Sequence, residues 1–162
     1  MKHTGLFPFV HLFPRQGVAE TRSLTIRGFP DLPDDDYGLM ESYCVEAGCN
    51  CRRVMLNVAS RRRQTIVASI SYAFDRDDEY PGPFMDPLNP QSRYAGVLLE
   101  LVEQVLADPA YVARLEAHYY QVKGAVNDPT HPCHQVLAQS DGPDGLRLPN
   151  RQARRARARK GR

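Results

Sequence analysis

Three cysteines lie close together in the segment Cys44-Val-Glu-Ala-Gly-Cys49-Asn-Cys51. Cysteine thiolates are common ligands of zinc, which takes four ligands at about 2.0–2.3 Å in a tetrahedron. The spacing is C-x4-C-x-C rather than the more usual C-x2-C, so reduced thiols or a redox pair remain alternatives. We favour a metal site, with zinc as the expected cofactor.

The residues beside the cysteines suit a metal-binding turn. Gly48 gives the backbone the freedom that a tight turn needs. Arg52 and Arg53 follow Cys51 directly, and we expect their positive charge to help keep the thiols ionised. The chain has only 4 cysteines in 162 residues, whereas disulfide scaffolds are usually shorter and denser in cysteine.

A structural zinc site built on three thiolates needs a fourth ligand from elsewhere in the chain. We expect His118, because it lies on the apolar stripe of a predicted helix that should face the sheet carrying the cysteines. The alternative interpretation is a core histidine satisfied by a hydrogen bond. The rival ligands lie in the His-Pro-Cys-His segment: Cys133, His134 and, less favoured, His131.

Alternating apolar and polar residues predict an antiparallel hairpin that begins just after the cysteines. Residues 52–59 and 65–74 each alternate, and the polar segment 60–64 joins them. Residues 37–43 predict a preceding strand that leads into the cysteines, so the metal knuckle should lie at a strand junction. Shorter strands are predicted over 23–27 and 84–85.

The hydrophobic period changes from 2 to 3.6 after residue 92. Ser92 is the expected N-cap of a first helix, whose apolar residues run from Ala95 to Leu106. Asp108 and Pro109 are suited to begin a second helix, and Gly124 to end it. The expected fold class is therefore α+β: an antiparallel meander of three to four strands with a two-helix pair packed on one face.

Composition divides the chain into four parts: an N-terminal arm over 1–22, an α+β zinc-binding domain over 23–126, a loop-rich segment over 127–150 and a disordered tail over 151–162. The tail is strongly basic, and the rest of the chain is net acidic. A sequence-nonspecific attraction to nucleic acid is therefore expected from the tail. Its basic residues are Arg151, Arg154, Arg155, Arg157, Arg159, Lys160 and Arg162.

Two motifs resemble known proteins. The YC-x4-CxCRRV segment that begins at Tyr43 and the DPLNPQS segment over 86–92 resemble a family of uncharacterised bacterial proteins, which also carry His-Tyr on a helix. This resemblance covers about residues 37–123, and it implies a metal site without implying a substrate. The CxC element is also distantly similar to SEC-C-type zinc motifs, although here Cys44 precedes the CxC pair.

No run of 18 or more apolar residues and no secretory signal is evident, so we expect a cytoplasmic protein without a membrane span. The favoured function is a zinc-stabilised protein-interaction module of unknown partner. The alternatives are a metal-dependent hydrolase with a three-ligand zinc site and a nucleic-acid-binding accessory protein that acts through the tail. Any basic patch outside the tail would involve Arg52, Arg53, Arg61, Arg62 and Arg63.

Overall fold

The computed structural model describes residues 5–140, in which helices and strands alternate as an α+β fold, as expected from the sequence. The elements appear in this order: β1 (Leu6–Pro8), α1 (Phe9–Leu12), α2 (Pro14–Glu20), β2 (Arg22–Ile26), β3 (Asp35–Cys44), β4 (Arg53–Ser60), β5 (Thr65–Ala73), β6 (Phe84–Met85), α3 (Ala95–Leu106), α4 (Pro109–Asn127) and α5 (Cys133–Gln139).

Within residues 5–140 the strands form one antiparallel six-stranded sheet in the order β1-β3-β4-β5-β6. Strand β2 pairs with β3 beside β1, so β1 and β2 lie end to end along the same edge of β3. The meander β3-β4-β5 and the edge strand β6 confirm the predicted hairpin and its neighbours. This topology places the β3–β4 connection, which carries the cysteines, at one end of the central strands.

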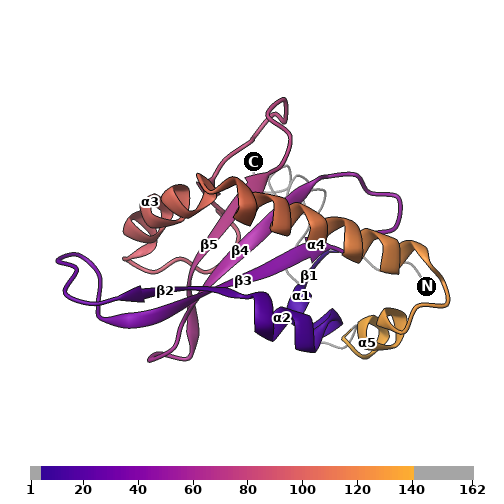
Figure 1. Ribbon diagram of the computed structural model, residues 1–162, viewed down its shortest axis with the longest axis horizontal. Helices are drawn as coiled ribbons and strands as arrows, with labels where there is room; N and C mark the ends of the chain where they lie inside the picture. Colours follow the sequence, from indigo (N-terminus) through magenta and orange to yellow (C-terminus); the bar gives the residue numbers. More distant parts are fainter. Residues whose placement is uncertain (1–4, 141–162) are drawn as a thin grey trace, which may run out of the picture.

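The two faces of the sheet follow from the alternation of side chains along each strand. On β4, for example, Val54, Leu56 and Val58 are all completely buried in the main core. Helices α3 and α4 pack against this core, and Figure 1 shows α4 crossing in front of the strands with α3 to its left. The Tyr43 hydroxyl donates a hydrogen bond of 2.9 Å to the Leu115 carbonyl, which fixes α4 against β3. The predicted two-helix pair on one face is confirmed.

The N-terminal segment differs from the extended arm predicted over residues 1–22. Its described residues form β1, α1 and α2, and they pack on the same core as the rest of the domain. Phe7 and Phe9 are almost fully buried, and Gly17 lets α2 approach α1, because a Cβ at Gly17 would lie only 2.6 Å from the Val10 Cα. No clear hydrophobic period is visible in this segment because its elements are only three to seven residues long.

The helices differ from the predictions mainly at their ends. Asp108 caps α4 as expected, with its side chain accepting a hydrogen bond of 3.0 Å from the Ala110 N–H. Helix α4 continues past Gly124 to Asn127, and α3 begins at Ala95 with Tyr94 as its N-cap. In the segment 127–150, expected to be loop, the described part contains the short helix α5, which packs against α1 and α4.

The Arg-rich tail over 151–162 lies outside the described residues, so its expected disorder and nucleic-acid binding remain predictions. In the part of the chain that the structure covers, no helix combines the length and the apolar character needed to cross a membrane.

Candidate metal centre

The cysteine turn connects the end of β3 to the start of β4. Cys44 is the last residue of β3, and the Cys49 N–H donates a hydrogen bond of 3.2 Å to the Glu46 carbonyl within the turn. Gly48 has φ +78°, a conformation that glycine adopts without steric cost. This turn brings the sulfur atoms of Cys44, Cys49 and Cys51 within 4.8 Å of one another. The structure therefore confirms that the three predicted cysteines converge.

The three sulfurs lie at the edge of the apolar interior. Cys44 is only 2% exposed and packs with Leu6 and Met55 in a small cluster beside the main core. Cys49 and Cys51 are half-buried and pack against the same cluster. One side of the cysteine cluster is thus shielded from water, and the other side can be reached from solvent.

The three thiols shift one another's pKa values. Hydrogen bonding from Cys51 lowers the pKa of Cys44 to about 6, against the effect of burial, and the positive charge of Lys123 assists. Burial and the charge of Cys44 raise the pKa of Cys49, and hydrogen bonding to Cys44 together with burial raises the pKa of Cys51. A metal ion binds thiolates, so binding here would displace the protons that remain on Cys49 and Cys51.

Helix α4 supplies the cation beside the cysteines. Lys123 is 8% exposed, and its ammonium group donates a hydrogen bond of 3.0 Å to the Glu46 carbonyl in the turn. The same ammonium lies 5.7 Å from the centre of the Tyr119 ring. Sequence reasoning did not identify Lys123, which lies far from the cysteines along the chain. The sequence feature that could have pointed to Lys123 is its position four residues after Tyr119, beside the buried stripe of a predicted helix.

Arg52 and Arg53 do not have the role expected from their position in the sequence. The Arg52 guanidinium pairs with Asp75 at 3.0 Å and with Glu116 at 2.8 Å. The Arg53 guanidinium pairs with Asp78 at 2.9 Å. Both side chains therefore fasten neighbouring segments to the start of β4, and Lys123 is the residue whose charge acts on the thiols.

His118 does not join the cysteines, which corrects its expected role as the fourth ligand. Its Nδ1 lies 2.6 Å from a carboxylate oxygen of Glu41, and its Nε2 contacts the carboxylate of Glu20. The imidazole also stacks on Phe9, with ring centres 4.2 Å apart. Because both ring nitrogens already have carboxylate partners and the imidazole itself is buried, the structure supports the alternative of a hydrogen-bonded core histidine.

The rival ligands also lie away from the cysteine turn. Cys133 is buried at the start of α5, where its N–H donates a hydrogen bond of 3.1 Å to Nδ1 of His131. His134 contacts the Asp128 carbonyl through Nε2 at 3.0 Å. Among residues 5–140, the group able to hold a metal ion consists of the three cysteines alone. The described part of the chain therefore provides three ligands and leaves the fourth coordination position open.

No family model, curated protein or solved structure matches this chain. The chemistry of the site has to be judged from its donor atoms. Three convergent thiols form a soft ligand set, which in proteins suits zinc, copper(I) or iron–sulfur chemistry rather than magnesium or calcium. The residues present thus fit a bound thiophilic metal ion.

Proposed function

We propose that this chain is a zinc-stabilised protein-interaction module. The observation that carries the proposal is the convergence of the Cys44, Cys49 and Cys51 sulfurs within 4.8 Å at the β3–β4 turn. Zinc suits this set because it accepts thiolate ligands, imposes no redox chemistry and stabilises small turns. A cytoplasmic setting, where thiols stay reduced, suits such a site as well.

The metal would fasten the long turn between β3 and β4. The turn has few backbone hydrogen bonds of its own, and one of them joins Cys49 to Glu46. Metal bonds from the end of β3 to the far side of the turn would hold a loop that otherwise contributes little to the sheet. The Lys123 ammonium then offsets the net negative charge of a zinc ion bound by three thiolates.

The open fourth position bears on how the module works. Cys49 and Cys51 are half-buried, so a ligand from outside the described residues can reach the metal. We propose that a protein partner supplies this ligand, which would make the bound metal part of the interface. In this account the partner binds at the β3–β4 turn.

A hydrolase is the second candidate, and the three-ligand geometry is the observation that favours it. Catalytic zinc sites keep three protein ligands and hold a water molecule in the fourth position. A hydrolase also needs a general base near that water. The side chain that helix α4 brings to the cysteines is that of Lys123, a hydrogen-bond donor whose ammonium is not a base, and this contact favours the interaction module.

X-ray absorption spectroscopy of the zinc-loaded protein distinguishes the two candidates. An interaction module should show three sulfur ligands, and its fourth ligand should change from a solvent oxygen to a donor atom of the partner protein when the partner binds. A hydrolase should keep an exchangeable oxygen ligand and should cleave model ester or amide substrates. Absence of metal–sulfur scattering would contradict both candidates.

A further inference from the structure

A separate hollow lies at the other end of β4, by the β4–β5 turn. It has a volume of about 260 Å³, slightly below the roughly 300–1,000 Å³ of sites for drug-sized ligands. Its walls come from four parts of the chain, namely the loop before β3, β3 itself, the β4–β5 hairpin and the segment before α3. The lining residues are Pro33, Asp35, Tyr37, Ser60, Arg62, Arg63, Val67 and Tyr94.

Two arginine guanidinium groups lie near the Tyr94 ring at the rim of this hollow. The Arg63 guanidinium lies 5.2 Å from the centre of the Tyr94 ring, and the Arg93 guanidinium lies 4.8 Å from it. Arg93 also donates a hydrogen bond of 2.6 Å to the Tyr94 hydroxyl oxygen. Within residues 5–140, neither arginine forms an ion pair with a carboxylate. Both are exposed, and both lie near the same aromatic ring.

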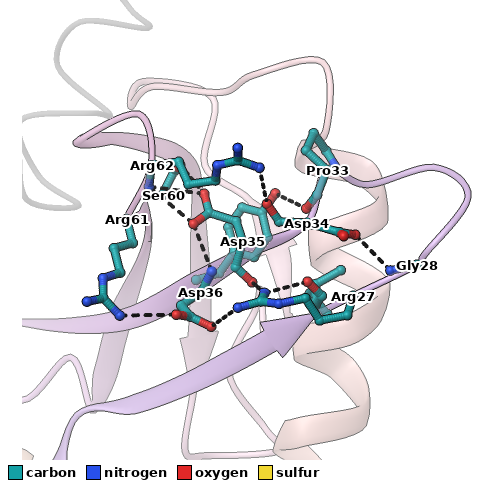
Figure 2. A network of polar contacts seen from close by, with 11 residues as sticks. Arg27, Gly28, Pro33, Asp34, Asp35, Asp36, Ser60, Arg61 and Arg62 are labelled. Atoms are coloured by element: carbon teal, nitrogen blue, oxygen red, sulfur yellow. Dashed lines mark hydrogen bonds and ion pairs between the residues drawn. The ribbon is translucent and has the colours of Figure 1, made fainter.

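The acidic residues next to the hollow are already engaged, as Figure 2 shows. Asp36 pairs with Arg27 at 3.3 Å and with Arg61 at 3.2 Å. Asp35 is 5% exposed and accepts hydrogen bonds from the Ser60 hydroxyl and from the Arg62 N–H. These contacts neutralise Asp36 and fix the backbone of the β4–β5 turn, which carries Arg62 and Arg63.

The inner part of the hollow is less polar than its rim. The Tyr37 side chain is almost fully buried, and its hydroxyl donates a hydrogen bond of 2.9 Å to the Pro33 carbonyl. Val67, at the irregular pairing of β4 with β5, belongs to the main core. Tyr37 and Val67 therefore form an apolar floor, and the accessible aromatic ring at the hollow is that of the half-buried Tyr94. A flat base can stack on this ring while its phosphate meets the guanidiniums outside.

We propose that this hollow, hereafter the Tyr94 slot, binds one nucleotide, either free or as a unit of single-stranded nucleic acid. The base would stack on Tyr94 above the apolar floor of Tyr37 and Val67, and the phosphate would be held by guanidinium groups. Guanidinium forks match phosphate oxygens in pairs, and aromatic rings stack on bases of any sequence. The phosphate would be bound by Arg62, Arg63 and Arg93.

A base paired within a duplex is stacked and cannot enter such a slot, so a single strand is preferred. This inference is independent of the metal site, because the cysteine turn and the Tyr94 slot lie at opposite ends of β4. It also differs from attraction by the basic tail, which contains no aromatic residue and gives no base stacking.

Fluorescence of 2-aminopurine tests the proposal, since stacking on an aromatic ring quenches this base. The full-length chain is titrated into a single-stranded oligonucleotide carrying 2-aminopurine and, separately, into the same strand in a duplex. Adenosine monophosphate and inorganic phosphate are then added as competitors, and recovery of the fluorescence reports their binding. We expect the protein to quench the fluorescence of the single strand and to leave that of the duplex unchanged. Binding of the mononucleotide with similar affinity would identify free nucleotides as the source, and much tighter binding of the oligonucleotide would identify a strand.

Three variants separate the Tyr94 slot from the tail. Arg63→Gln and Tyr94→Leu should each weaken the quenching interaction on the order of 10-fold. Arg76→Gln is the matched control, because Arg76 is an exposed arginine in the loop after β5 that does not line the slot. Equal binding by all three variants would overturn the proposal. Binding of the labelled single strand without any quenching would overturn it too, because the base would then have no place in the site.

Discussion

His118 and Glu41 form a buried pair in which Nδ1 of the histidine lies 2.6 Å from a carboxylate oxygen of the glutamate. The side chains are 3% and 4% exposed, respectively. Glu20 contacts the other ring nitrogen, and the Tyr43 hydroxyl oxygen lies 3.0 Å from the Glu41 carboxylate. This network joins α2 and α4 to β3, so its role is to hold the N-terminal segment on the domain.

Replacing His118 by alanine should therefore destabilise the fold without emptying the metal site. Removing one partner of a buried ion pair leaves the other charge uncompensated, which typically lowers the free energy of unfolding by about 3–5 kcal/mol. Urea unfolding measures this loss, and metal analysis of the folded variant measures retention. A His118→Ala protein that folds normally but binds no zinc would restore His118 as a ligand.

Stability should also depend on pH through the same residue. Burial alone would lower the pKa of His118, but hydrogen bonds and charge from Glu41 and Glu20 outweigh burial and raise it. The folded state therefore holds the proton more tightly than the unfolded chain. This stabilisation is complete below the unfolded pKa of about 6.5 and is lost as pH rises through the higher folded value.

The Glu20 carboxylate, which contacts His118, affects stability at acidic pH. The hydrogen bond from His118 lowers the pKa of Glu20, so its contribution is present at neutral pH and is lost as pH falls through the lowered folded value.

Urea midpoints of the wild type and His118→Gln should differ most in mildly acidic solution and converge as pH rises above neutrality. A constant difference from about pH 6 to pH 9 would show that His118 does not titrate as described.

Lys123 should strengthen metal binding through its charge. Replacing it with methionine keeps most of the side chain's volume but removes the cation that favours the Cys44 thiolate. Loss of a group that supports metal ligands commonly weakens affinity by about 10–100-fold, and we expect the lower end of that range. Competition with a chromophoric zinc chelator measures the change. An unchanged affinity in Lys123→Met would mean that the lysine serves only to hold the Glu46 carbonyl.

The Gly48 conformation gives a test of the turn that leaves all three sulfurs in place. At φ +78° an alanine is strained, with an expected destabilisation of about 1–2 kcal/mol, although a Cβ at this position would meet no other atom. Gly96→Ala is the matched control: a Cβ there also meets nothing within 4 Å, but Gly96 lies in α3, where alanine is favoured. Chemical denaturation should show opposite signs for the two variants, and equal effects would contradict this account of the turn.

Local patterns in the sequence were sufficient for the hairpin of β4 and β5 and for α3 and α4. The alternation over 52–59 and 65–74 and the helical spacing after residue 92 are each complete within one element. The pairing of β1 with the end of β3 was not predictable in this way, because it joins Leu6 to Cys44 without any local signal.

The candidate site shows the same division between local and distant information. Cys44, Cys49 and Cys51 converge because one short turn carries them all. The partners of His118 come from positions 20 and 41, and the cation near the cysteines comes from position 123, so only the packing of α4 on the sheet determines them. An apolar stripe predicts which face of α4 is buried, but not which polar groups it meets there.

We propose that Cys44, Cys49 and Cys51 together bind one zinc ion. Elemental analysis of the full-length protein, prepared without chelator, should find about one equivalent of zinc. Replacing any of the three with serine should remove most of it, whereas Cys133→Ala, which alters the buried cysteine of α5, should retain it. Zinc-free wild-type protein with three freely reactive thiols in the β3–β4 turn would contradict the account.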